Sequence, residues 1–152
     1  MTNSRNFDLN TFLPYLLNQA AEATSRGFQS VYAAEFGMTR TQWRVLANLG
    51  KFGSMTAKDI CRISHIEKTK VSRAISALEQ IGHLRRCAST EDRRAEILSL
   101  TDEGRHIFAA LGRRAQDFDL RLRAELGSAT AAELEDLLKR LVRLNSVEGR
   151  QP

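Results

Sequence analysis

Two adjacent arginines, Arg93 and Arg94, follow an acidic residue, Asp92, and precede an alternating apolar run that ends at Thr101. The whole stretch, residues 89–105, reads STEDRRAEILSLTDEGR. Paired guanidinium groups bind anions, since each carries a fixed positive charge and several N–H donors. In an enzyme such a pair would grip an anion within a pocket, whereas in a nucleic-acid-binding protein it would lie exposed. The rest of the chain decides between these two arrangements.

The positive charge of the chain is concentrated in one segment. The 152 residues carry 23 Lys and Arg against 18 Asp and Glu, a net charge of +5. Residues 51–94 hold 10 of these bases and 5 of the acids, so this segment alone has a net charge of +5, and the remaining 13 bases and 13 acids cancel. Such a localised excess is expected of a module that meets phosphates; the alternative is a solvated basic surface without a partner.

Length and composition predict one globular domain of ordinary size. Hydrophobic residues make up 42% of the chain and charged residues 27%, which are the proportions of a folded protein. No apolar run approaches the roughly 18–20 residues of a membrane span, and the N-terminus lacks the layout of a signal peptide. The two cysteines, Cys61 and Cys87, are too few for a disulfide framework. We therefore expect a cytoplasmic protein with no membrane partner.

Hydrophobic periodicity predicts a mainly α-helical chain with two short strands. In the first long helix, Pro14 is tolerated because it falls in the first turn, and Gly27 weakens the middle. The expected helices cover residues 9–36, a segment opened by the capping box Thr39–Gln42, residues 56–63, 67–81 and 101–126, and a last segment opened by a second capping box, Thr130–Glu133; the expected strands are 84–88 and 95–100.

Apolar residues at regular spacing predict the core. Leu98 and Leu100 alternate with polar neighbours, as in a half-buried strand. The residues expected to face inward from the short helices are Trp43, Val45, Leu46 and Leu49, then Ala57, Ile60 and Cys61, and finally Val71, Ala74, Ile75, Leu78 and Ile81.

The opposite face of the 67–81 helix is basic and rich in hydroxyl groups. Two short helices joined by a tight turn and followed by a hairpin describe a winged helix-turn-helix, whose second helix enters the major groove of DNA. The hairpin tip, with Arg93 and Arg94, would reach the adjacent minor groove or its phosphates. The residues expected to contact DNA from the second helix are Lys68, Thr69, Lys70, Ser72, Arg73 and Ser76.

A thirteen-residue pattern then points to a family. Asp92 to Gly104, DRRAEILSLTDEG, matches the wing pattern D-x-R-x-x-x-L-x-L-T-x-x-G of the MarR family of bacterial transcriptional regulators at every fixed position. KTKVSRAISALEQIGHLRR, residues 68–86, resembles the recognition helix and first wing strand of that family. The resemblance covers nearly the whole chain. It implies one domain over 1–152, of the mainly α, α+β winged-helix class, with a winged helix-turn-helix DNA-binding lobe at 39–100 and long dimerisation helices at 9–36 and 101–147.

The resemblance also implies partners. We expect a homodimer that binds a pseudo-palindromic site on double-stranded DNA, more often as a repressor than as an activator, and that is released by a small ligand such as an aromatic acid. Asp92 should hold Arg94 in a fixed direction through a carboxylate–guanidinium pair, unless it is merely a solvated loop acid. The residues that would line a ligand crevice, or else simply belong to the core, are Phe28, Tyr32, Trp43, Arg44, His106 and Phe108.

Other functions find little in the sequence. No nucleophile–base pair, phosphate-binding glycine loop or clustered metal ligands are recognisable, so we expect no enzyme, no cofactor and no metal. A redox role of Cys87, near Arg85 and Arg86, stays an alternative. So does a different class of protein, a winged-helix module for chromosome architecture or protein interaction with only non-specific DNA contact.

Overall fold

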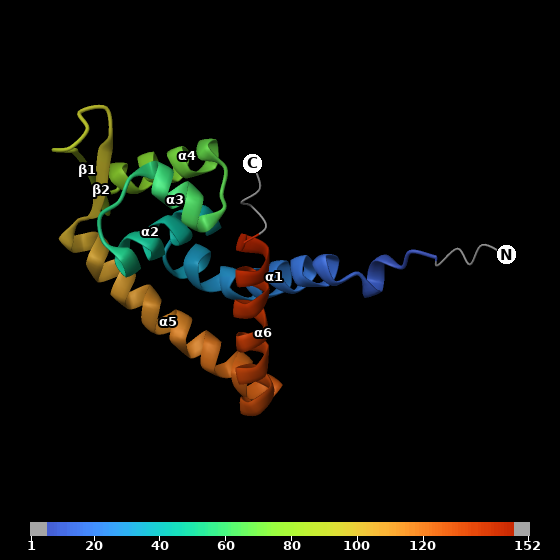
Figure 1. The fold of residues 1–152 in the computed structure, drawn as a ribbon. Helices are drawn as coiled ribbons and strands as arrows, with labels where there is room; N and C mark the ends of the chain where they lie inside the picture. The colour runs from blue at the N-terminus through green and yellow to red at the C-terminus, as the bar shows by residue number, and fades with distance from the viewer. Residues whose placement is uncertain (1–5, 148–152) are drawn as a thin grey trace. The chain divides into compact units, whose positions relative to one another are not determined.

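The structure, a computed structural model, describes residues 6–147 as helices and one two-stranded sheet (Figure 1). The predicted mainly α-helical class is confirmed. The chain divides after Gly112 into two units. Helix α5 (Asp102–Leu126) begins in the first unit and ends in the second, and α6 (Ser128–Val147) lies wholly in the second. No helix among the described residues is long and apolar enough to cross a membrane.

The N-terminal segment is broken at Phe12. Leu9–Thr11 form a 3-10 helix (η1), Phe12 is extended, and helix α1 runs over Leu13–Gln29. The prediction of one continuous helix from Leu9 is therefore wrong at its start. A helix running unbroken through Pro14 would bring the proline ring against the carbonyl group four residues earlier. Starting α1 at Leu13 leaves Pro14 in the first turn, where its missing N–H costs nothing.

The following helix begins where the sequence predicts. After α1, the chain continues as a π-helix, η2 (Ser30–Glu35), and α2 then covers Arg40–Phe52. The predicted capping box of α2 is confirmed: Oγ1 of Thr39 accepts a hydrogen bond from the Gln42 N–H at 3.2 Å, and Oε1 of Gln42 accepts one from the Thr39 N–H at 3.1 Å. Two backbone donors that a helix leaves unpaired at its start are thereby satisfied.

Helices α3 (Ala57–Ser64) and α4 (Lys68–Gln80) form the helix-turn-helix pair. A second capping box opens α3, since Thr56 and Asp59 exchange hydrogen bonds at 3.1 Å, and it is not among the predicted ones. His65 ends α3 in the left-handed conformation, with φ of +53°. This conformation reverses the chain within a tight turn, as a helix-turn-helix requires.

The two strands form an antiparallel hairpin, which we call the wing. Strand β1 (Leu84–Ala88) has the predicted bounds, and β2 (Glu96–Leu100) begins one residue later than predicted. Leu84 pairs with Leu100, and Ala88 pairs with Glu96, so the chain reverses over residues 89–95. Backbone hydrogen bonds in both directions between Met55 and Leu98, at 3.1 and 2.8 Å, attach β2 to the segment between α2 and α3.

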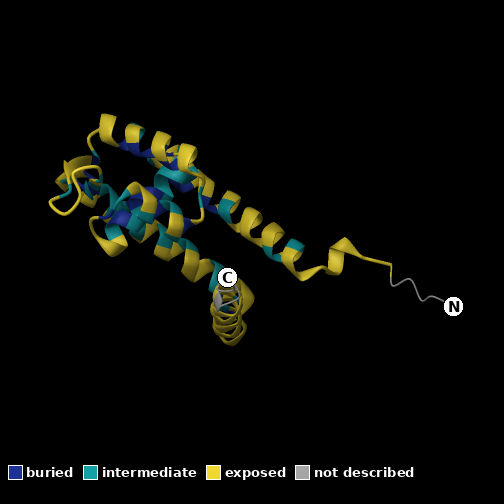
Figure 2. Cartoon of the chain, turned by 45° about the horizontal axis from the view of Figure 1, so that its top comes forward, coloured by how far each residue is buried: buried dark blue, intermediate teal, exposed yellow. Residues whose placement is uncertain are grey.

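The core of the first unit includes α2, α3, α4 and the base of the wing, where Figure 2 shows many of the buried residues. The alternation predicted for β2 is confirmed, because Leu98 and Leu100 are both buried. Burying a side chain of this size contributes about 1.5–3 kcal/mol. Residues predicted to face inward and found buried are Val45, Leu46, Leu49, Ile60, Val71, Ala74, Ile75 and Leu78.

Two of the predicted core positions are wrong, and two are only half-buried. Ala57 is exposed because it is the first residue of α3. Ile81 is 55% exposed because it lies just beyond the end of α4, where the backbone leaves the helical stripe. Trp43 and Cys61 are half-buried.

Thr101 joins the end of α4, the base of the wing and the start of α5. Its hydroxyl donates to the carbonyl of Gly82 at 2.6 Å and accepts from the Gly104 N–H at 3.0 Å, which confirms its predicted role as the cap of α5. Its own N–H donates to the carbonyl of His83 at 3.1 Å. Gly104 is buried against His83, and a Cβ atom at Gly104 would lie 1.9 Å from the His83 carbonyl oxygen. The Thr-x-x-Gly spacing therefore meets two requirements, a cap and a close approach of two backbones.

The second unit contains the C-terminal part of α5 and all of α6. Gly127 ends α5 with φ of +86°, as predicted. The predicted capping box at Thr130 is wrong: α6 begins at Ser128, and the Ala131 N–H donates to the carbonyl of Gly127 at 2.9 Å, which leaves Thr130 inside the first turn. Arg123 of α5 bonds to Glu135 of α6 at 2.8 Å and holds the two helices together.

Replacing Gly104 with alanine should destabilise the first unit, because the new Cβ atom would overlap the His83 carbonyl group. We expect the free energy of unfolding to fall by about 1–3 kcal/mol, the usual cost of overpacking. The measurement is denaturant unfolding followed by circular dichroism.

Gly112 provides the matched control for Gly104, since it lies in the same helix and a Cβ atom there would meet nothing within 4 Å. Gly112→Ala should leave stability unchanged or raise it slightly, because alanine favours helix over glycine. Equal stability of the two alanine variants would contradict the close approach at Gly104.

Candidate nucleic-acid interface

Helix α4 presents a basic and hydroxyl-bearing face to solvent. Val71, Ala74, Ile75 and Leu78 are buried on its inner side. Among the ion pairs of the described residues, none involves a lysine or arginine on the outer face of α4. These charges are therefore available to an external anion. The exposed residues of this face are the six predicted to contact DNA: Lys68, Thr69, Lys70, Ser72, Arg73 and Ser76.

The turn before α4 is fastened from α2. Nη2 of Arg44 donates to the carbonyl of Ser64 at 2.9 Å and so satisfies a carbonyl group at the C-terminal end of α3. Burial lowers the pKa of Arg44 from its ordinary value. Arg44 is one of the residues predicted to line a ligand crevice or the core, and its hydrogen bond in the structure gives it a role in positioning the helix-turn-helix.

The wing carries its two predicted arginines at an exposed tip. Arg93 and Arg94 lie in the loop between β1 and β2 and are exposed, and no ion pair of the described residues involves either. The loop is closed at its base by a hydrogen bond from the Ser89 N–H to the Ala95 carbonyl at 3.0 Å. The two guanidinium groups therefore lie on an exposed loop and not in a pocket for a small anion.

Asp92 shapes the tip differently from the prediction. Its Oδ1 accepts a hydrogen bond from the backbone N–H of Arg94 at 2.9 Å, whereas the predicted pair would have used the Arg94 guanidinium. A short side chain that bonds the backbone two residues later forms an Asx-turn, which stabilises a tight reversal. Oγ of Ser89 adds bonds from the N–H groups of Glu91 and Asp92, at 3.2 and 3.3 Å. Asp92 thus fixes the backbone from which the arginines project.

Arg86 was not predicted to belong to the interface, but it connects α4 with the wing. Its Nε donates to Glu79 at 2.9 Å, its Nη1 to Glu96 at 3.0 Å and its Nη2 to Ser76 at 3.2 Å. The hydrogen bonds to Glu96 and Glu79 raise the pKa of Arg86 above its ordinary value. The available signal in the sequence was the presence of acids at positions 79 and 96 within a basic segment, but their convergence on one side chain depends on the fold.

The residues predicted to line a ligand crevice do not form one pocket. Phe28 packs against Tyr32 and Trp43 with ring centroids 5.8 Å apart in each pair, and Phe28 and Tyr32 are buried. This cluster has the geometry of core aromatics. His106 is exposed on α5. Tyr32 lines one pocket, beside Met38 and Arg40, and Phe108 lines a different one.

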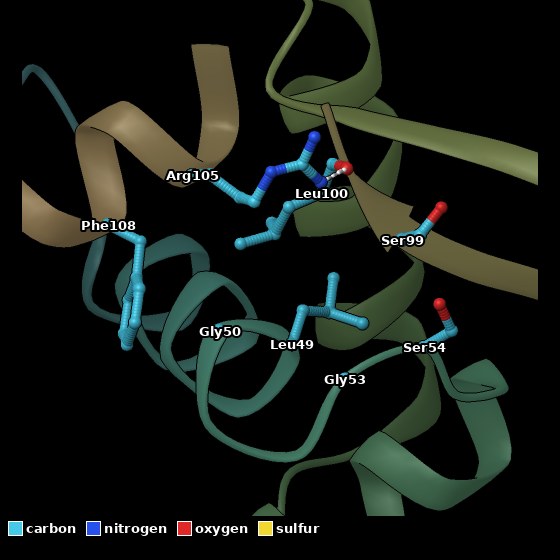
Figure 3. A pocket seen from close by; sticks show the side chains of 8 residues that line it. All are labelled: Leu49, Gly50, Gly53, Ser54, Ser99, Leu100, Arg105 and Phe108. Atoms are coloured by element: carbon cyan, nitrogen blue, oxygen red, sulfur yellow. Dashed lines mark hydrogen bonds between the residues drawn. The ribbon is translucent and has the colours of Figure 1, made fainter. Parts of the chain in front are cut away.

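The pocket at Phe108 has a volume of about 440 Å³ and lies between α2, the wing base and α5 (Figure 3). A Cβ atom at Gly50 would lie 2.6 Å from the Phe108 ring, so the glycine lets this ring lie against α2. Arg105 lies at the rim, donates to the carbonyl of Leu100 at 2.9 Å and pairs with Asp102. The pocket lining is completed by Leu49, Gly53, Ser54, Ser99 and Leu100.

The last candidate sites are those for metal or redox chemistry. Among residues 6–147, no three His, Cys, Asp or Glu side chains gather in an arrangement that could hold a metal ion. Cys87 is exposed on β1 and Cys61 is half-buried on α3, and both are free thiols.

The comparisons with known proteins identify the family. A family model described as MarR family matches residues 36–95, the span from before α2 to the wing tip. A MarR family transcriptional regulator from Silicibacter pomeroyi DSS-3 superposes with a TM-score of 0.80 at 27% identity, over 91% of this chain and 98% of that one. The chain belongs to the MarR family.

Two further relatives of this MarR-family chain show the breadth of the match. The HTH-type transcriptional regulator FarR of Neisseria gonorrhoeae is 26% identical over 128 residues, which are 84% of this chain and 87% of FarR. The structure of NadR in complex with 4-hydroxyphenylacetate superposes with a TM-score of 0.74 at 26% identity, over 93% of this chain and 96% of NadR. The protein is accordingly a DNA-binding transcriptional regulator with a winged helix.

The two groups of basic residues should affect DNA binding in different ways. Arg94→Ala should weaken binding to every duplex and reduce the slope of log affinity against log salt by about 0.9, the value for one lost phosphate contact. Arg73→Ala or Thr69→Ala should instead change which sequences are preferred, at about 1–3 kcal/mol for a base-reading residue. Salt-dependent fluorescence anisotropy on several duplexes separates the two effects.

The control is Arg121→Ala, which removes an exposed arginine from the second unit. It should leave both the slope and the sequence preference unchanged. A wild-type salt slope for Arg94→Ala would contradict the assignment of the wing tip to a phosphate.

Proposed function

We propose that this regulator is a homodimer that binds a pseudo-palindromic site on double-stranded DNA, represses transcription there, and is released by a small aromatic acid. One observation carries the proposal. Helix α4, whose outer face has basic side chains without acidic partners, and the wing, which has two exposed arginines, belong to the same unit. Repression, rather than activation, rests on the family resemblance alone.

In this proposal α4 reads bases from the major groove. Arg73 and the two lysines supply charge for phosphates or guanine edges, because guanidinium and ammonium groups donate to the O6 and N7 atoms of guanine. Thr69, Ser72 and Ser76 have short side chains that both donate and accept, so they permit a close approach of the helix to base edges. The wing arginines contact the neighbouring minor groove, whose negative potential is strongest where the groove is narrow.

The homodimer is supported by apolar side chains that the chain leaves uncovered. In the second unit Ala131 is the one buried apolar residue of α6 among those described, although the helix carries a leucine-rich stripe. A soluble protein rarely exposes so many large apolar residues unless a partner covers them. A second copy of the chain is the partner that gives the two-fold symmetry of a palindromic site. The exposed apolar residues of the two terminal segments are Phe7, Leu9, Phe12, Leu13 and Leu16 at one end, and Leu120, Leu126, Leu134, Leu137, Leu138, Val142 and Leu144 at the other.

The pocket at Phe108 is the site that we propose for the ligand. An aromatic ring would contact Phe108 and Leu49, and a carboxylate would bind the guanidinium of Arg105. Arg105 would then release the carbonyl of Leu100, the last residue of β2, so that binding changes a contact at the wing base. NadR, which was solved with 4-hydroxyphenylacetate, supports a ligand of this chemical class.

The proposal predicts sequence-specific binding by a dimer. A duplex that the wild-type protein selects from a random-sequence pool should bind at least about 10³ times more tightly than an unrelated duplex. The selected sequence should also occur upstream of the gene. Analytical ultracentrifugation should give two protein chains per duplex. Equal affinity for selected and unrelated duplexes would contradict the proposal and favour an architectural protein with non-specific DNA contact.

The ligand is tested in the same titration with 4-hydroxyphenylacetate and a set of benzoic acids. A ligand of the proposed class lowers the affinity for the selected duplex. Arg105→Ala, which itself removes the bond to the Leu100 carbonyl, should lower that affinity without ligand and abolish any further response to the ligand. A response that persists in Arg105→Ala would place the ligand elsewhere.

A further inference from the structure

Arg86 occupies a different environment from the other bases of the positive segment. Its side chain is 32% exposed, and three of its nitrogen atoms bond to three separate side chains. Two of those partners, Ser76 and Glu79, lie one turn apart on α4, and the third, Glu96, is the first residue of β2. One planar group therefore connects the recognition helix with both strands of the wing. We call Arg86, Ser76, Glu79 and Glu96 the Arg86 cluster.

The charge of the Arg86 cluster is opposite to that of the surface around it. One guanidinium and two carboxylates sum to −1, so the cluster has no spare positive charge for a phosphate. The hydrogen bonds occupy Nε, Nη1 and Nη2 together. A guanidinium that contacts DNA would instead direct these donors away from the protein, as the unpaired side chains of Arg93 and Arg94 are free to do. Arg86 therefore uses its hydrogen-bond donors within the protein.

The position of the cluster along the wing shows what it constrains. At the wing base, Thr101 already bonds to Gly82 and His83 and so fixes the point where β1 leaves α4. Arg86 lies two residues further along β1, opposite Leu98, on the way to the tip. A hairpin fixed only at its base can still tilt as a whole, whereas a second attachment further out prevents that tilt. The two attachments together set the distance from the α4 outer face to the wing tip.

We propose that Arg86 is a positioning residue for sequence-specific DNA binding, which holds the wing at the angle where its tip and the recognition helix reach the same duplex together. The proposal rests on the specific DNA binding proposed above. Because a base-reading helix tolerates only small displacements, loosening the wing should reduce binding to the preferred sequence more than binding to any duplex.

Neutralising the two acids of the cluster gives a test in which the proposal and general electrostatic attraction predict different changes in DNA affinity. Glu79→Gln/Glu96→Gln removes two negative charges and so raises the net charge by two, and a general attraction to phosphates should therefore tighten binding to every duplex. If Arg86 holds the wing, the same change lowers the affinity for the selected duplex relative to an unrelated one. We expect that ratio to fall by about fivefold or more, as for a network of partly exposed charged groups. Arg86→Lys should act in the same direction, since an ammonium group cannot reproduce the three-way geometry.

A charge-matched control is available in the same region. Glu67 and Glu91 are exposed, and no ion pair of the described residues involves either, so Glu67→Gln/Glu91→Gln removes the same two negative charges outside the cluster. This control should strengthen binding to both duplexes and keep their ratio within about twofold of wild type. A ratio that stays at the wild-type value in the cluster variant, or that falls equally in the control, would overturn the proposal.

Hydrogen–deuterium exchange on the DNA-free proteins provides a readout that does not depend on a preferred sequence. The amides of β1 and β2 should exchange faster in the cluster variant than in the control, while the core amides of α2 stay protected and show that both variants fold. If the strands of the cluster variant exchange faster but the wild-type protein prefers no sequence, Arg86 does attach the wing, and the proposed sequence-specific function is refuted. Unchanged exchange in the strands would refute the attachment itself.

Discussion

The hydroxyl group of Thr101 is the interaction on which the arrangement of the DNA-binding unit depends. Through this residue and its own N–H, the end of α4, the base of the wing and the first turn of α5 meet within hydrogen-bond distance. Gly104 allows that meeting, since any larger residue would collide with the carbonyl of His83. A displacement at the start of α5 would therefore change contacts of both α4 and the wing. This explains in physical terms why threonine and glycine stand three residues apart after the wing.

Electrostatics divides the basic segment into two classes of residue. Lys68, Lys70 and Arg73 on α4, with the two arginines of the wing tip, have no acidic partner among the described residues and remain available to phosphates. Arg86 and Arg44, in contrast, use their donors within the protein, on carboxylates in one case and on a helix-end carbonyl in the other. Net charge alone does not distinguish these roles. The candidate interface consists of the lysine and arginine side chains that form no ion pair within the protein.

Local signals in the sequence predicted what depends on local structure. The capping box at Thr39, the cap at Thr101, the bounds of β1 and the inner stripe of α4 from Val71 to Leu78 all follow from short-range spacing, and the structure confirms them. The wing pattern also predicted the family, since its fixed positions include both the exposed tip and the buried Thr-x-x-Gly contact.

Features that depend on alternatives within a turn, or on tertiary contacts, were not predictable in the same way. Asp92 had two donors within reach, and the backbone N–H of Arg94 was favoured over its guanidinium because it closes a tight turn. Thr130 carried a capping pattern, but Gly127 supplied an earlier start for α6. The three partners of Arg86 are separated by up to twenty residues and converge only through folding. The aromatic residues Phe28 and Phe108 likewise lie in separate places that composition does not distinguish.

Hydroxyl-radical footprinting on the selected duplex tests most directly whether helix and wing engage DNA together. The account predicts two symmetric regions of protection whose centres lie about 10 base pairs apart, one for each recognition helix. Each region should be flanked by a protected minor-groove segment that disappears when Arg93 and Arg94 are both replaced by alanine. A single asymmetric footprint, or flanking protection that is unchanged in the double alanine variant, would contradict it.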